Sequence, residues 1–193
     1  MTASALLADN YGARCSPQGG HFVFYLVSSN DDGPIKIHDI LNIYIYIYMN
    51  IQKIIFLKLR FVMAFIFLWA FIDKVFGLGF ATTKENAWIN GGSPTTGFLS
   101  FGTHGPFESI FKSMAGVLVV DWLFMLGLLF IGLTLLLNKF VTWGAIAGII
   151  MMILMWLAAL PPENNPVVDD HIVYALVLAL LITISKRKTD STK

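Results

Sequence analysis

Charged residues are scarce in this sequence, and their scarcity excludes several classes of protein. They account for 13% of the 193 residues, whereas soluble domains carry ~25%. The formal net charge is only +1, so the chain has no basic field that would hold nucleic acid and no acidic tail. We therefore expect no nucleic-acid partner.

Cysteine is scarcer still, and groups of metal-ligating residues are missing. Cys15 is the single cysteine, which excludes an internal disulfide and a CxxC redox pair. No ligand pair has the i, i+4 spacing typical of a metal site. His104, in the string THGP, is interpreted as a surface loop residue. The sequence therefore predicts no metal site and no covalently bound cofactor.

What the chain does have is long apolar runs. Two of them, within residues 117–137 and 140–160, are separated only by Asn138 and Lys139. An α-helix rises ~1.5 Å per residue and the bilayer core is ~30 Å thick, so each run can cross a membrane. So short a connection predicts an antiparallel pair of membrane helices.

Two more apolar runs, at residues 54–77 and 166–185, flank this pair. The sequence thus predicts an all-α integral membrane protein, a four-transmembrane-helix bundle formed by residues 51–188, with the lipid bilayer as its main partner. Residues 189–193 are predicted to form a cytoplasmic tail. Gly144 and Gly148 are expected to form a ridge of small residues at which the helices pack closely.

Lysine and arginine sort to one side of these spans. Lys74, Lys84 and Lys112 fall on the side of the loop between the first and second spans, and the other ten fall on the opposite side. Because cytoplasmic segments carry the excess of Lys and Arg, the N-terminus and C-terminus are predicted to be cytoplasmic and the long loop to lie outside.

The first 50 residues do not resemble the rest, and we expect them to be poorly structured. Residues 43–48 read IYIYIY, an alternation typical of a strand, but an isolated strand has no partner. One hypothesis is that this repeat is a translated run of alternating A and T, and that the natural start is Met49 or Met63. The alternative is a genuine cytoplasmic extension in which residues 40–56 lengthen the first helix or lie along the interface.

The loop at residues 77–116 is long enough to fold on itself or to carry function. Several helix-start signals predict short interfacial helices within it. We interpret the loop either as a lid over the outer ends of the helices or as a binding loop. The signals are Thr82 with Glu85 three residues later, Ser93 before Pro94, and Pro106.

Ionisable residues are missing from the middle of every span and gather at the outer ends. A charge at a helix centre costs ~2.5–3.5 kcal/mol on insertion scales and marks ion or substrate pathways. Its absence disfavours a proton-coupled transporter or an ion channel. The outer residues are either solvated helix ends or a polar pocket. The predicted pocket contains Asp73, Lys74, Trp88, Asp121, Asp170, His171 and Tyr174.

A histidine in this group would allow the pocket to exchange protons. His171 beside acids can exchange a proton near neutral pH, and the reduction or oxidation of a quinone headgroup requires such an exchange. Quinone is therefore the candidate cofactor, and no catalytic residue is assigned.

Five strings carry a resemblance to a known family, over residues 60–185. The strings are FIFLWAFIDKVFGLGFAT at residues 65–82, AWINGGSPTTGFL at 87–99, DWLFMLGLLFIGL at 121–133, MMILMWLA at 151–158 and NPVVDDHIVYALVL at 165–178. Through them the chain resembles the DoxX family of small four-helix membrane proteins of bacteria and archaea, which is similar to the membrane subunit of archaeal thiosulfate:quinone oxidoreductase.

The resemblance implies a multi-pass protein in the plasma membrane of a prokaryote. It implies a membrane subunit of a quinone-linked oxidoreductase in sulfur or redox-stress chemistry, which works with a soluble or membrane partner subunit and is not catalytic alone. The alternative is a non-catalytic membrane anchor or scaffold subunit.

Overall fold

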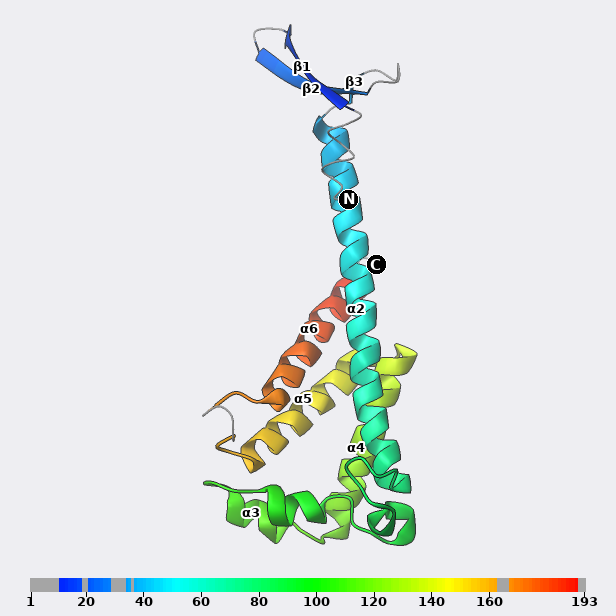
Figure 1. Ribbon diagram of the computed structural model, residues 1–193, viewed down its shortest axis with the longest axis vertical. Helices are drawn as coiled ribbons and strands as arrows, with labels where there is room; N and C mark the ends of the chain where they lie inside the picture. Colours follow the sequence, from blue (N-terminus) through cyan, green and yellow to red (C-terminus); the bar gives the residue numbers. More distant parts are fainter. Residues whose placement is uncertain (1–10, 19–20, 29–33, 36, 163–166, 191–193) are drawn as a thin grey trace. The chain divides into compact units, whose positions relative to one another are not determined.

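The computed structural model describes residues 11–18, 21–28, 34–35, 37–162 and 167–190, with side chains described for 40–162 and 167–185. The chain divides into two compact units, Met1–Ile55 and Phe56–Lys193 (Figure 1). The boundary lies five residues after the one expected from the sequence, and it falls inside a helix.

The first unit contains a small antiparallel sheet. Its strands are β1 (Tyr11–Gln18), β2 (His21–Ser28) and β3 (Pro34–Ile35), in the order β1-β2-β3. Tyr11 lies opposite Ser28 in the register. The sequence predicts an all-α chain with little regular structure in its first 50 residues. The sheet differs from both of these predictions. The β2 string HFVFYLVS is rich in aromatic and β-branched residues, which favour strands.

Helix α2 (Ile37–Phe76) follows, and it runs through the whole Ile-Tyr repeat. The interpretation of residues 43–48 as a strand pattern is therefore wrong. The alternative, in which residues 40–56 lengthen the first helix, agrees with the structure. Tyr44 and Tyr48, four residues apart, stack with ring centroids 6.5 Å apart, as neighbours on a helical face do. Strand propensity is a weak preference that a continuous helix overrides. Where translation starts stays a prediction.

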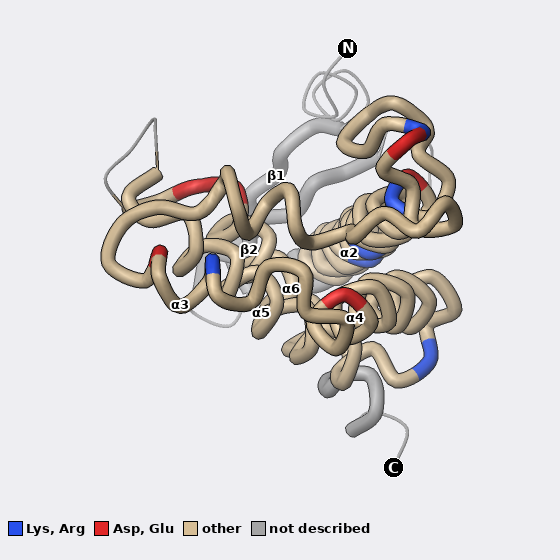
Figure 2. Tube along the Cα trace, turned by 90° about the horizontal axis from the view of Figure 1, so that it is seen from below, with Lys and Arg blue, Asp and Glu red and all other residues tan. Residues whose placement is uncertain are grey.

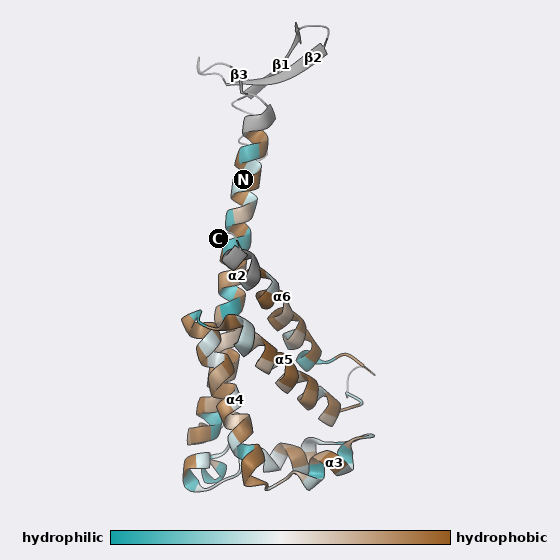
Figure 3. Cartoon of the chain, turned by 180° about the vertical axis from the view of Figure 1, so that it is seen from behind, coloured by the Kyte–Doolittle hydropathy of each residue, from teal (hydrophilic) through white to brown (hydrophobic). Residues whose placement is uncertain are grey.

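Three more long helices complete the second unit: α4 (Leu118–Leu137), α5 (Val141–Ala158) and α6 (Asp170–Asp190). Together with α2, α4 and α5 make three helices in the described chain that are long and apolar enough to cross a membrane. The apolar part of α6, Asp170–Ser185, is shorter than these. Figure 3 shows hydrophobic colouring along α4 and α5 and over most of α6.

The interior of this unit draws on all four long helices. Phe67 of α2, Ile131 of α4, Ala145 of α5 and Leu178 of α6 are all buried in one apolar cluster. The outward faces are apolar as well; Leu123, for example, is 73% exposed. Large apolar side chains on both the inside and the outside suit helices surrounded by lipid rather than water.

Glycines set the closest contacts between these helices. A Cβ added to Gly144 of α5 would lie 1.8 Å from Thr134 Oγ1 of α4, and one added to Gly148 would lie 2.7 Å from Leu178 of α6. The small-residue ridge predicted on this helix is therefore confirmed. Gly132 of α4 meets Leu68 of α2 in the same way.

The loop between α2 and α4 contains four short helical segments. They are η1 (Lys84–Asn86), η2 (Trp88–Asn90), the π-helical η3 (Phe98–Gly102) and α3 (Glu108–Ser113). The capping box predicted at Thr82 is wrong, because η1 is preceded by Thr83 and no side chain caps it. Figure 2 shows Lys, Arg, Asp and Glu mainly in the loops and near helix ends.

Candidate functional site

Asp73 is the first of the predicted pocket residues, and its carboxylate holds the beginning of the loop between α2 and α4. The side chain is 1% exposed, in the last turn of α2. Its two oxygens accept hydrogen bonds from the backbone N–H groups of Phe80 (3.3 Å) and Ala81 (2.9 Å). Gly77, at φ 63°, ends the helix and lets the chain turn back to this carboxylate. Asp73 therefore acts as an anchor for the loop.

Asp121 plays the same part at the start of α4. It is 4% exposed, and its Oδ1 accepts hydrogen bonds from the Ser93 hydroxyl (2.8 Å), the Thr95 hydroxyl (2.5 Å) and the Thr95 N–H (3.3 Å). Ser93, which the sequence places before an N1 proline, also accepts a bond from the Thr96 N–H (3.1 Å). A carboxylate in the first turn of a helix is further stabilised by the helix dipole.

Lys74 and Trp88 join the same assembly through aromatic rings. The Lys74 ammonium lies 5.8 Å from the ring centroid of Phe124, a cation–π contact between α2 and α4. Trp88, from η2, meets Trp122 of α4 edge to face, with centroids 4.7 Å apart. The ends of α2 and α4 and the loop are therefore held together by buried carboxylates and by rings.

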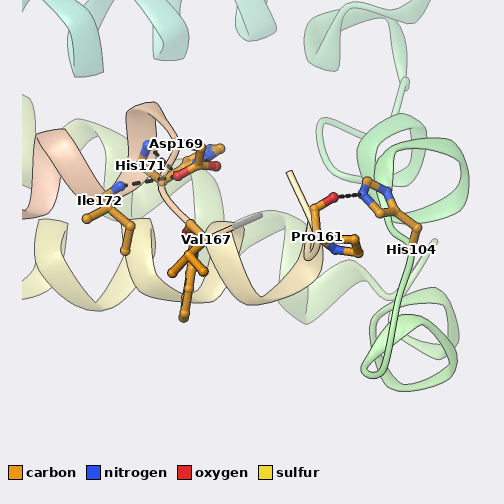
Figure 4. Close-up of polar contacts among 7 residues, drawn as sticks. His104, Pro161, Val167, Asp169, His171 and Ile172 are labelled. Atoms are coloured by element: carbon orange, nitrogen blue, oxygen red, sulfur yellow. Dashed lines mark hydrogen bonds and ion pairs between the residues drawn. The ribbon is translucent and has the colours of Figure 1, made fainter. Parts of the chain in front are cut away.

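His171 is paired with a carboxylate at the beginning of α6. Its Nδ1 lies 2.6 Å from Asp169 Oδ2, and the Asp169 Oδ1 accepts the N–H groups of His171 (3.1 Å) and Ile172 (3.3 Å) (Figure 4). Asp169 is thus the N-cap of the helix. Because an ionised carboxylate only accepts hydrogen bonds, Nδ1 is the donor in this contact. The two side chains are 22% and 18% exposed.

The predicted pocket residues fall into two groups. Asp73, Lys74, Trp88 and Asp121 belong to the first, at the ends of α2 and α4. The described hydrogen bonds and ion pairs of these side chains do not join them to His171. Figure 1 shows α6 beginning on the side of the unit where α5 ends. One shared pocket stays a prediction.

The second group, Asp170, His171 and Tyr174 at the beginning of α6, differs from the expectation in one residue. Asp170 is exposed, and Asp169 is the acid that contacts His171. Tyr174, one turn further along α6, is half-buried against the apolar cluster. Sequence reasoning missed Asp169, although an acid directly before an apolar helix is a known N-cap signal.

A second histidine closes the loop against the end of α5. His104 Nε2 lies 2.9 Å from the Pro161 carbonyl oxygen, and the His104 N–H donates to the Ala158 carbonyl (3.1 Å) (Figure 4). These contacts support its interpretation as a loop residue. Among the described residues, no group of three or more His, Cys, Asp or Glu side chains is placed to hold a metal ion.

Comparison of the chain with protein-family models, with curated proteins and with solved structures finds no match in any of the three.

Proposed function

We propose that this protein is a four-span, DoxX-like membrane protein that serves as the membrane subunit of a quinone-linked oxidoreductase in sulfur or redox-stress chemistry. The observation that carries the proposal is the pairing of His171 with Asp169 at the first turn of an apolar helix. It supports a site for proton exchange at the depth of the membrane where apolar core gives way to polar surroundings.

The fourth span in this proposal is α6. Its apolar part, Asp170–Ser185, corresponds to about 24 Å of helix. This is short of the ~30 Å bilayer core, and a short span is accommodated by local thinning of the bilayer. With four spans, both ends of the chain lie on one side, and the excess of Lys and Arg favours the cytoplasm of a prokaryotic cell for that side. The loop at residues 77–116 then lies outside.

The quinone headgroup gains or loses protons together with electrons, and His171 would supply the proton. Asp169 binds the imidazole through Nδ1, so Nε2 would be the atom that exchanges the proton with the quinone. Electrons have to come from a partner subunit, because the chain has one cysteine and no nucleotide-binding motif. The partner and the electron donor are part of the proposal.

A measurement of bound quinone tests this function. The full chain, purified from its membrane in mild detergent, should carry quinone that solvent extraction and chromatography detect. His171→Ala and Asp169→Asn should reduce the bound amount severalfold, whereas Asp170→Asn should not, because Asp170 is exposed and one residue away. Folded protein without quinone, or equal quinone in all variants, would overturn the proposal.

An anchor or scaffold subunit is the second candidate, and a different observation favours it. Asp73 and Asp121, two acids of the predicted pocket, bind the loop through five hydrogen bonds rather than facing an open site. A well-fixed outer loop suits a docking surface. In that case Asp121→Ala should weaken co-purification of a partner, and His171→Ala should leave it unchanged.

A further inference from the structure

An apolar groove runs along the outside of the second unit between α2 and α4. It encloses about 410 Å³, and its lining has almost no polar surface. The α2 residues of the lining recur at helical spacing, so they share one face of that helix. Phe65, near the middle, is 64% exposed. The lining residues are Phe61, Phe65, Leu68, Trp69, Ile72 and Leu136.

The groove has the length of one leaflet of a bilayer. Its α2 lining begins at Phe61 and ends at Ile72, and eleven residues of helix rise about 16 Å. The hydrocarbon core of a bilayer is ~30 Å thick, so one leaflet is about half of that. A single acyl chain lying parallel to α2 would fill the groove.

A cation lies at one end of this groove. Arg60 precedes the first lining residue, and its guanidinium carbon lies 5.4 Å from the centre of the Phe61 ring. On the α4 side, Leu136 lies two residues before Asn138, whose side-chain oxygen accepts a hydrogen bond from Arg60. The groove therefore runs from a guanidinium at the end of α4 along α2 to Ile72, one residue before Asp73.

The charge of Arg60 is not neutralised within the described chain. Its described partner is the neutral amide of Asn138, and its Nε has no hydrogen-bond acceptor among the described residues. No described ion pair involves it. An arginine at the polar edge of a membrane binds phosphate oxygens well through its terminal N–H groups, because its planar fork matches their geometry.

We propose that this groove is a binding site for an anionic phospholipid. The headgroup phosphate is bound by Arg60, and one acyl chain lies over Phe65 and Trp69 along the groove. Basic residues between membrane helices at the polar edge recognise anionic headgroups in this way. The proposal is independent of the quinone function, since it uses a different face and different residues.

Two other occupants are distinguishable by charge. A quinone tail or a second copy of the chain would cover the apolar groove but would have no use for a phosphate-binding guanidinium at its end. Binding of either would not depend on the charge of the surrounding lipid headgroups. Dependence on headgroup charge is therefore the property to measure.

Tryptophan fluorescence reports on the groove directly because Trp69 lines it. The full chain is reconstituted into phosphatidylcholine vesicles in two samples. One contains a fixed fraction of brominated phosphatidylglycerol, and the other contains the same fraction of brominated phosphatidylcholine. Brominated acyl chains quench nearby indoles. Subtracting the quenching of the Trp69→Phe variant removes the signal of the other four tryptophans. We expect Trp69 to prefer the brominated phosphatidylglycerol about tenfold, the value of one charge-assisted contact.

Two variants identify the source of the preference. Arg60→Gln should remove it. Lys58→Gln is the matched control, because it deletes one positive charge at a similar depth while lying about 160° away around α2. Lys58 is exposed, and its variant should keep the preference.

Three results would overturn the proposal. Equal quenching by both brominated lipids in the unchanged protein would do so without any variant, so a misfolded Arg60→Gln protein cannot hide a failure. An equal loss in Lys58→Gln and Arg60→Gln would indicate diffuse attraction to the surface. Absence of Trp69 quenching by either lipid would show that a second copy or another molecule covers the groove.

Discussion

Replacement of Asp121 by alanine should uncouple the loop at residues 77–116 from α4. The carboxylate accepts three hydrogen bonds, from the Ser93 hydroxyl and from the hydroxyl and N–H of Thr95. Hydrogen bonds to a charged group contribute ~1.5–3 kcal/mol each, and donors left buried without an acceptor cost ~1–3 kcal/mol. Thr95 is 5% exposed, so water cannot fully replace the lost acceptor. Because the three bonds share one oxygen, we expect a total loss of about 3–5 kcal/mol rather than their sum.

Thermal unfolding in detergent and amide hydrogen exchange measure this effect together. Asp121→Ala should lower the melting temperature and should speed exchange at residues 93–96. Asp121→Asn keeps one acceptor oxygen without the charge. Its melting temperature and its exchange rate should lie between those of the unchanged protein and those of Asp121→Ala. Asp170→Ala is the matched control, because this acid also lies in the first turn of a helix but is exposed.

The reasoning would be refuted by a variant that exchanges no faster than the unchanged protein at residues 93–96. It would also be refuted if Asp170→Ala and Asp121→Ala lowered the melting temperature equally. In that case the loss would come from the helix dipole, which both acids share, and not from the loop.

Two further predictions concern packing and charge. Gly144→Ala should destabilise the protein by about 1–3 kcal/mol, since its Cβ would lie 1.8 Å from Thr134 Oγ1. Gly97→Ala should cost nothing in the same chemical-denaturation experiment, because that glycine has a helical φ of −60° and open space around it. The exposed Lys112 ammonium, 2.6 Å from the Glu108 carboxylate, lowers the pKa of Glu108 by hydrogen bonding. This pair can stabilise only above the ordinary pKa of Glu108 and loses its effect as the pH falls through the lowered one. Because the pair is exposed, Glu108→Gln should leave stability unchanged at neutral and acidic pH, and a clear drop at neutral pH alone would contradict this.

The sequence predicts α4 and α5 to within two residues, for a simple physical reason. Long apolar runs can only be membrane helices or buried ones, and the polar pair Asn138 and Lys139 marks the turn between them. Asn138 adopts φ 57°, a left-handed conformation that asparagine tolerates at the end of a helix. Pattern and length are local properties, so one sequence suffices to read them.

The N-terminal unit and the candidate site were harder to predict because they depend on distant partners. By propensity the Ile-Tyr repeat favours a strand. In the structure it is helical, because it belongs to the same continuous helix, α2, as the apolar residues that follow it. Asp73 and Asp121 read as pocket residues because the sequence does not say that residues 80–95 fold back over them. Asp169 and Asp170 are adjacent and identical in type, and only the start of α6 decides which one contacts His171.

Because Asp73 and Asp121 are buried, the integrity of the helices that carry them depends on the loop at residues 77–116. Every described hydrogen bond to the two carboxylates comes from residues 80–95. A proteolytic cut in that stretch would loosen the hold of these donors on two buried charges, so damage to the loop would spread to the ends of two apolar helices. Cleavage there would therefore destabilise the ends of α2 and α4 as well as the loop itself.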